Sequence, residues 1–163
     1  MEQWDVLDAQ GNPVGRLHTR GVPMAKGDYH LVVDIWIQDD AGRYLIARRA
    51  PQKEPFAGCW AMTCGCAVAG DDSLAAALRE VREELGLELD PKAGRMRRRW
   101  VDPAVGSIVD AWFFRQNVRL GDVVLQLEET DQAAWADREE ILRMIADGRF
   151  VDMDRVPYAE ELL

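Results

Sequence analysis

The sequence has few of the groups that cross-link a chain or hold it in a membrane. Its 163 residues include three cysteines, and no apolar run approaches the roughly 20 residues that a membrane span requires. Cys59, Cys64 and Cys66 are an odd number of thiols in one short segment, which is a poor disulfide framework. The opening MEQWDVLDAQ lacks the basic and apolar regions of a signal peptide. We therefore expect a cytoplasmic protein with reduced thiols and no membrane partner.

Positive charge is also scarce. Lysine and arginine number 20 against 29 aspartates and glutamates, which gives a formal net charge of -9. Such a chain repels an extended polyanion, so nucleic acid is not an expected partner, whereas a small phosphorylated ligand is compatible if a metal bridges it. The length, the 48% hydrophobic content and the absence of repeats or linkers predict one compact domain.

Turn signals separate a series of short apolar segments. Residues 1–28 contain QWDVLDAQGNPVGRL, which predicts an N-terminal β-hairpin around a Gly-Asn-Pro turn. Segments 31–37 and 43–49 are predicted to pair as a second hairpin across the turn at 39–42. Further strands are expected near 60–64 and at 95–102, 109–118 and 122–128.

Two helices are predicted. The first occupies DDSLAAALREVREELG, with Asp72 or Ser73 as its N-cap and Gly86 at its end. Its core face is expected to carry Leu74, Leu78, Val81 and Leu85. The second helix spans 137–148, capped by Asp137 and ended near Gly148. It is expected to turn Ile141, Leu142 and Ile145 toward the core.

Three glutamates crowd one sector of the first helix. Glu80 lies three and four positions before Glu83 and Glu84, spacings at which like charges repel by about a few tenths of a kcal/mol. A solvated acidic face is one interpretation of this pattern. A bound cation that offsets the repulsion is the other.

The segment around these glutamates matches a known signature. Residues 65–87 read G-x5-D-x7-REV-x-EE-L-G-L, which resembles the Nudix box, G-x5-E-x7-RE-U-x-EE-x-G-U with U aliphatic. Asp71 is the one departure. WDVLDAQGNPVGR, GDYHLVVDIWI, RRAPQKEPFAGCW and LEETDQAAWADREEI further resemble the Nudix branch that includes isopentenyl-diphosphate isomerase and its hydrolase-like relatives. The resemblance implies a single Nudix domain over 1–163, an α/β/α sandwich with a mixed sheet.

The same resemblance implies a metal site. Glu80, Glu83 and Glu84 would hold Mg²⁺ or Mn²⁺, hard cations that prefer carboxylate oxygens, and the carbonyl of Cys64 would join them. Glu80 and Glu83 would also take part in catalysis, and Arg79 would orient the acids. A carboxylate outside the box, Glu128 or Glu129, is expected to complete the catalytic set.

The implied reaction is hydrolysis of a diphosphate linkage in a nucleoside diphosphate-X type molecule, by water attack at phosphorus. Gly65 would let the backbone approach the substrate, and Arg48 and Arg49 are expected to bind it. The basic run at 97–99 either contacts phosphate or forms a solvated strand edge. Asp71 could weaken a supporting contact because its side chain is one methylene shorter than glutamate. Homodimers are common in the family, so a homodimer is a compatible assembly.

Three alternatives stay open at this point. An isomerase would use Cys64, which stands where that branch has its catalytic cysteine, and His30, which resembles one of its metal ligands; Cys66, however, replaces a histidine, and no clear glutamate appears around Asp110. A non-catalytic module would bind a nucleotide without turnover. A zinc site on the three cysteines lacks a clear fourth ligand. The intact glutamates rank the hydrolase first.

Overall fold

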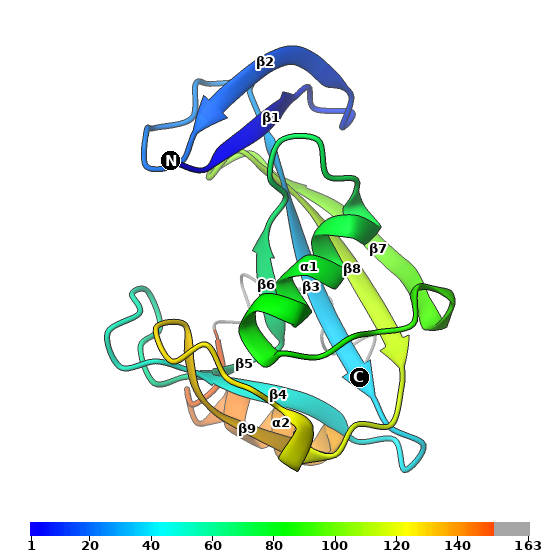
Figure 1. The fold of residues 1–163 in the computed structure, drawn as a ribbon. Helices are drawn as coiled ribbons and strands as arrows, with labels where there is room; N and C mark the ends of the chain where they lie inside the picture. Colours follow the sequence, from blue (N-terminus) through cyan, green and yellow to red (C-terminus); the bar gives the residue numbers. More distant parts are fainter. Residues whose placement is uncertain (152–163) are drawn as a thin grey trace.

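A mixed sheet with one helix on each face forms the body of the protein (Figure 1). The computed structural model describes residues 1–151. Its elements are β1 (Gln3–Leu7), β2 (Pro13–Thr19), β3 (His30–Gln38), β4 (Tyr44–Arg49), β5 (Trp60–Ala61), β6 (Thr63–Cys66), α1 (Ser73–Leu85), η1 (Pro91–Ala93), β7 (Gly94–Asp102), β8 (Ser107–Arg115), η2 (Leu120–Asp122), β9 (Thr130–Ala136) and α2 (Arg138–Ala146). The expected α/β/α sandwich is confirmed.

The sheet is mixed because β3 pairs in both directions. It runs parallel to β8 along its whole length and antiparallel to β6. Its pairing with β4 is limited to Ile37 with Leu45 and Gln38 with Tyr44. The predicted second hairpin is therefore confirmed only beside its turn. Beyond it β4 pairs with β5 and β9, which form the lower part of the sheet in Figure 1.

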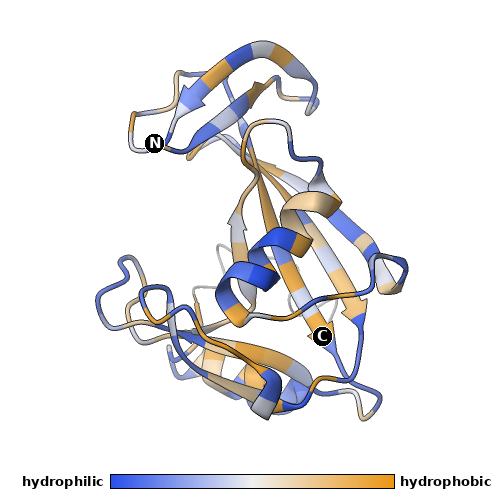
Figure 2. Ribbon diagram, in the orientation of Figure 1, coloured by the Kyte–Doolittle hydropathy of each residue, from blue (hydrophilic) through white to orange (hydrophobic). Residues whose placement is uncertain are grey.

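The core has two parts, one on each face of the sheet. Because successive side chains of a strand point to opposite faces, Val33, Ile35 and Ile37 pack with α1 while Trp36 packs with α2. Trp36 stacks on Phe113 at a centroid distance of 6.1 Å. Figure 2 shows the apolar residues concentrated on the central strands, with hydrophilic turns around them.

The predicted boundaries of α1 are confirmed. The Asp72 carboxylate caps the helix by accepting a hydrogen bond from the amide of Ala75 at 2.8 Å, and Gly86 ends it in the left-handed conformation with φ 64°. Val81 and Leu85 are fully buried. Leu74 and Leu78 are half-buried, because the helix approaches the sheet most closely through two small residues, Ala76 and Ala77.

The second helix, α2, ends at Ala146, close to the predicted end, but its core residues differ in part from the prediction. It begins after Asp137, whose carboxylate accepts from the amide of Glu140, as predicted. Ile141 is fully buried, whereas Leu142 and Ile145 are only half-buried and Met144 takes the second core position. Within residues 1–151 neither helix is long and apolar enough to cross a membrane.

The strand predicted at 122–128 is wrong. Residues 120–122 form a 3-10 turn, and the loop that follows binds the end of α1: the amide of Val124 donates to the Leu85 carbonyl at 2.8 Å, and that of Gln126 to the Glu84 carbonyl at 3.0 Å. The last carbonyls of a helix need such partners. The apolar alternation of DVVLQLE therefore packs the loop against α1 instead of extending the sheet.

One strand, β9, has no counterpart among the predictions. Its sequence TDQAAWA has few β-branched residues, so intrinsic propensity does not indicate a strand. Pairing with β4 along six positions supplies the missing stabilisation. The strands predicted near 60–64 and at 95–102 and 109–118 are confirmed as β5 with β6, β7 and β8.

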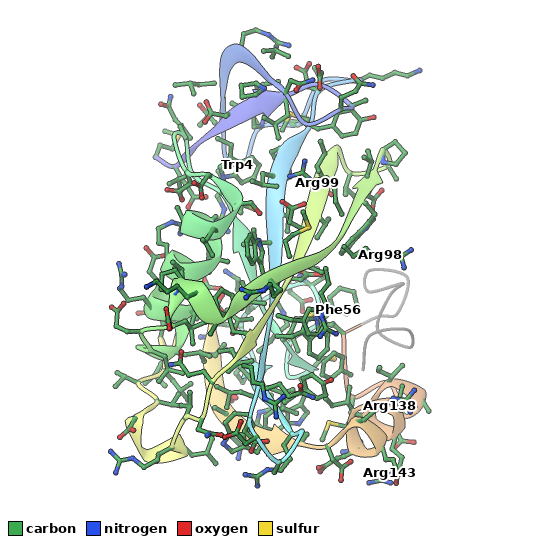
Figure 3. All side chains as sticks on the ribbon, turned by 90° about the vertical axis from the view of Figure 1, so that its right-hand side faces the viewer. Trp4, Phe56, Arg98, Arg99, Arg138 and Arg143 are labelled. Carbon is green, nitrogen blue, oxygen red and sulfur yellow. The ribbon has the colours of Figure 1, made fainter. Side chains whose placement is uncertain are left out.

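The N-terminal hairpin is also confirmed, as a separate two-stranded sheet. It is joined to the body by a bridge between Leu7 and Tyr29 and by a hydrogen bond from the Gly70 amide to Asp5 at 2.7 Å. Trp4 lies beneath the hairpin (Figure 3) and stacks on His30 with ring centroids 4.2 Å apart. These contacts fix the hairpin on the start of β3 and on the loop before α1.

A buried charge fixes the start of α1. Asp110 is fully buried on β8 and accepts two hydrogen bonds from Arg99, at 2.6 and 2.7 Å. It also accepts from the Ser73 hydroxyl at 2.6 Å, and that hydroxyl in turn accepts from the indole of Trp112 at 2.8 Å. Ser73 thus connects the first turn of the helix to the sheet, which is why Asp72 alone serves as the cap.

The Asp110 network predicts a stability effect. Asp110→Asn should lower the free energy of unfolding by about 2 to 3 kcal/mol, because it removes the charge that pairs with Arg99 inside the protein. The matched control is Asp40→Asn, whose exposed pair with Arg115 should contribute little to stability. Urea unfolding measures both values, and equal losses in the two variants would contradict this account.

Candidate active site

Arg79 is the centre of the acidic cluster. Its Nε donates to Asp71 at 3.0 Å, and its Nη1 donates to Glu80 at 2.9 Å and to Glu83 at 3.0 Å. Its Nη2 donates to the backbone carbonyl of Cys66 at 2.8 Å. One guanidinium therefore holds three carboxylates against β6. The contact also answers the question raised by Asp71, since the shorter side chain still reaches Arg79.

Gly65 is required by the position of Glu80. A Cβ at residue 65 would lie 2.0 Å from the carboxyl carbon of Glu80, far inside van der Waals contact. The glutamate side chain is 12% exposed and lies directly against the strand backbone. Figure 2 shows that α1 is most hydrophilic toward its C-terminal end.

The charge of Glu80 is incompletely compensated. Burial raises the pKa of its carboxyl to about 7, against the lowering effect of Arg79, and the negative charges of Glu83 and Glu2 raise it further. A carboxylate in this position is stabilised by any additional cation. Arg79 alone does not restore the ordinary pKa of 4.5.

Glu84 is compensated still less. Burial, followed by the charges of Glu80 and Glu129, raises the pKa of its carboxyl to about 8, and Arg49 and Lys53 only partly oppose this. No hydrogen bond from a side chain among residues 1–151 reaches its carboxylate. Glu80 and Glu84 therefore form a half-buried acidic pair with a deficit of positive charge.

Glu129 is the carboxylate outside the box that lies at this cluster. Its charge acts on Glu84, and its side chain forms an ion pair with Lys53. Glu128, the other predicted candidate, is exposed. The predictions from the sequence did not include Lys53. Its position four residues after Arg49, in the loop that follows β4, could have indicated that it lies near the same site.

The two predicted substrate-binding arginines lie in different surroundings. Arg49 acts on the charge of Glu84, and its Nε donates to the carbonyl of Pro55 at 3.0 Å. Arg48 instead forms a two-point ion pair with Asp131, at 2.8 and 2.9 Å. Strand alternation explains the difference, because neighbours on β4 point to opposite faces. Arg49 is at the acidic cluster, and Arg48 is not.

The residues of the isomerase alternative are not brought together. Cys64 lies opposite Asp34 on β3. His30 lies four residues before Asp34 on the same strand, which separates these two residues by roughly 13 Å at the rise of a strand. Burial, and then the Asp34 charge, raise the pKa of the Cys64 thiol well above its ordinary value. Burial, aided by His18, lowers the pKa of His30 to about 4, so its ring is neutral beneath Trp4.

The cysteines do not form a zinc site in this arrangement. Cys59 contacts the carbonyl of Gly148 at 3.8 Å, near α2, while burial raises the pKa of Cys66 to about 11. Within residues 1–151 no three His, Cys, Asp or Glu side chains are spaced as a ready-made metal site. The same holds for the glutamates of the first helix, of which Glu80 and Glu83 are paired with Arg79.

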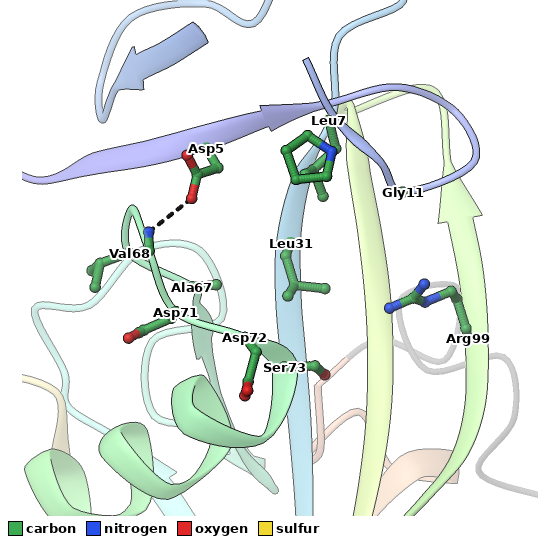
Figure 4. Close-up of a pocket in the computed structure, with 12 residues that line it drawn as sticks. Asp5, Leu7, Gly11, Leu31, Ala67, Val68, Asp71, Asp72, Ser73 and Arg99 are labelled. Atoms are coloured by element: carbon green, nitrogen blue, oxygen red, sulfur yellow. Dashed lines mark hydrogen bonds between the residues drawn. The ribbon is translucent and has the colours of Figure 1, made fainter. Parts of the chain in front are cut away.

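The basic run at 97–99 lies on β7, the edge strand beyond β8. The glutamates lie over β6, which pairs with β3 on the other side of β8. Arg97 lies over the ring of Phe113 at 4.8 Å, and Arg99 pairs with Asp110. Arg99 also lines a cavity of about 380 Å³ between the hairpin and the start of α1 (Figure 4). Asp71 forms part of its wall, so the cavity adjoins the acidic cluster without containing Glu80, Glu83 or Glu84.

Comparison with known proteins identifies the family. The NUDIX domain model matches residues 28–155. An uncharacterized Nudix hydrolase of Listeria monocytogenes is 34% identical over 93% of this chain and 89% of its own. An isopentenyl-diphosphate Delta-isomerase of Escherichia coli is 31% identical over 86% of this chain and 79% of its own. The crystal structure of DR0079 from Deinococcus radiodurans has a TM-score of 0.80, with 22% identity and 98% coverage of both chains, which shows a shared fold. The chain belongs to the Nudix hydrolase family.

Proposed function

We propose that this protein hydrolyses a diphosphate linkage in a small nucleoside diphosphate-X type molecule, with Mg²⁺ or Mn²⁺ as its cofactor. One observation carries the proposal: Glu80 and Glu84 are half-buried together with too little positive charge around them. Such an arrangement is costly unless a ligand compensates it, and uncompensated acids of this kind are typical of functional sites. Family membership supports the reaction class.

The residues present suit a hard divalent cation. Glu80, Glu83 and Glu84 would hold the metal through carboxylate oxygens, the donors that Mg²⁺ and Mn²⁺ prefer, and the backbone carbonyl of Cys64 would join them. When bound, the metal supplies an acidified water and neutralises charge on the phosphates. Arg79 would keep the carboxylates in place from the side opposite the substrate.

The side chains around the glutamates would handle the proton and the leaving group. The water oxygen forms a bond to phosphorus as the bond to the bridging oxygen breaks, and Glu129 accepts the proton that the water loses. Arg49 and Lys53, which already act on the charge of Glu84, would stabilise the negative charge on the departing phosphate. In this proposal Arg48 remains with Asp131 and supports the site only through β4.

The isomerase reading ranks second. Its support is the likeness to isopentenyl-diphosphate isomerases and the position of Cys64 immediately before Gly65. Against it, His30 is distant from Cys64 along β3 and stacks on Trp4, and Asp110 is neutralised by Arg99. The positions that would correspond to the isomerase's own metal site are therefore engaged in packing.

Hydrolysis should depend on Glu83. Against a panel of nucleoside triphosphates, nucleotide sugars, dinucleotides and isopentenyl diphosphate, the wild type should release phosphate or nucleotide only with Mg²⁺. Glu83→Gln should lower kcat by at least about 100-fold, the size typical of losing one charge-stabilising group at a reacting centre. Glu88→Gln is the matched control, because Glu88 is exposed and, within residues 1–151, its carboxylate pairs with Arg82 alone.

The other outcomes of this panel are equally informative. Double-bond migration in isopentenyl diphosphate that requires Cys64, without hydrolysis, would move the protein to the isomerase branch. Ligand binding without either reaction would identify a nucleotide-binding module. Equal activity of Glu83→Gln and Glu88→Gln would contradict the proposed site.

Stability should fall as pH rises in the metal-free protein. The folded pKa values of Glu80 and Glu84, about 7 and about 8, lie above the ordinary 4.5, so the folded state retains protons that the unfolded state releases. Their stabilising effect is complete below the ordinary pKa and is lost as pH rises through the folded values, by up to about 1.4 kcal/mol per pH unit for each group. Urea unfolding between about pH 5 and about pH 8.5 measures this slope.

Mg²⁺ should reverse the loss at the alkaline end, because a bound cation favours the charged carboxylates, and should have little effect at the acidic end. The double variant Glu80→Gln, Glu84→Gln should show a flatter pH profile and no response to Mg²⁺. The same steep profile in the double variant would show that other groups cause it.

A further inference from the structure

Arg20 lies at the end of the hairpin that meets the Nudix box. It follows β2 directly, and its backbone amide donates to the carbonyl of Glu2 at 3.1 Å. The residue after Glu2, Gln3, begins β1, and its carbonyl accepts at 2.8 Å from the amide of Ala69, in the loop between β6 and α1. The same loop continues to Asp71, whose carboxylate binds Arg79. The ends of the two hairpin strands are therefore fixed to the segment that carries the acidic cluster.

The guanidinium of Arg20 is held by a short chain of contacts. Its Nη1 donates to Glu2 at 3.0 Å, and the other oxygen of Glu2 accepts from the indole of Trp4 at 2.7 Å. Trp4 is in turn fixed by its stack on His30. The Arg20 side chain remains 53% exposed, and among residues 1–151 its guanidinium donates only to Glu2. Most of its five N–H groups are thus available to a ligand.

The charges of this pair interact with groups at the glutamate cluster, since Glu2 raises the pKa of Glu80. Burial opposes ionisation of Glu2, yet the hydrogen bond from Trp4 and the charges of Arg20 and Arg79 lower its pKa. For Arg20, burial opposes the charged form, while Glu2 and then Cys66 and Glu129 raise its pKa. These mutual effects agree with the backbone contacts. Arg20 is on the cluster side of the hairpin.

We propose that Arg20 binds a phosphate of the substrate, so that the N-terminal hairpin supplies a substrate-binding residue of the active site. The inference rests on the proposed function, because it assigns a contact to the same diphosphate ligand. A planar guanidinium matches phosphate oxygens at two points, and Glu2 orients it in advance. The surrounding glutamates repel an anionic substrate, which makes an exposed cation beside them valuable for binding.

Binding of imidodiphosphate, a diphosphate that resists hydrolysis, tests this role in the full chain with Mg²⁺. Arg20→Gln should weaken binding about tenfold or more, as expected for losing a charge-assisted hydrogen bond. Arg20→Lys should recover part of the loss because the charge is kept. The matched control is Arg16→Gln on the same hairpin, where Arg16 is engaged with Asp28 at 2.8 Å; its affinity should equal that of the wild type.

Kinetics on any compound that the panel identifies should show a raised KM for Arg20→Gln with kcat within about threefold of the wild type, the pattern of lost uniform binding. Equal affinity of Arg20→Gln and wild type for imidodiphosphate, or equal losses in the Arg16 and Arg20 variants, would overturn the inference. If no compound is hydrolysed but imidodiphosphate binding still depends on Arg20, the proposed hydrolysis fails while the binding role of Arg20 stands.

Discussion

The site depends on the contact of one guanidinium with several acids. Arg79 bonds to Asp71, Glu80 and Glu83 and to the carbonyl of Cys66, so it both neutralises the crowded carboxylates and attaches them to β6. Glu80 can lie in this arrangement only because residue 65 has no side chain. The remaining negative charge, on Glu80 and Glu84, is the part that the protein itself leaves uncompensated.

The fold holds α1 at both ends, and this gives the acids a defined place. At its start, Ser73 bonds to the buried Asp110, which pairs with Arg99. At its end, the loop after η2 donates its amides to the carbonyls of Glu84 and Leu85, and the same loop leads to Glu129. Structural contacts at the last turn of the helix therefore also deliver the carboxylate from outside the box. The N-terminal hairpin is attached at Ala69 and Gly70, in the loop that precedes α1.

Local sequence signals predicted the parts of the molecule that depend on local physics. The caps of α1 and the N-terminal hairpin follow from neighbouring residues, and the structure agrees with them, whereas the Nudix box was predicted from its resemblance to a known family. The loop over 122–128 and strand β9 could not be predicted in this way, because long-range partners decide them: the end of α1 binds the first and β4 pairs with the second. The same limit applies to Arg48 and Arg49, which differ only in the face of β4 from which they project.

The central claim is that the glutamate cluster is built for a divalent cation. The most direct measurement is anomalous scattering from crystals grown with Mn²⁺, because it locates the metal independently of activity. We expect one strong anomalous peak from Mn²⁺, bounded by carboxylate oxygens of Glu80, Glu83 and Glu84. A peak elsewhere, for example among the three cysteines, or no peak at all with saturating Mn²⁺, would contradict it.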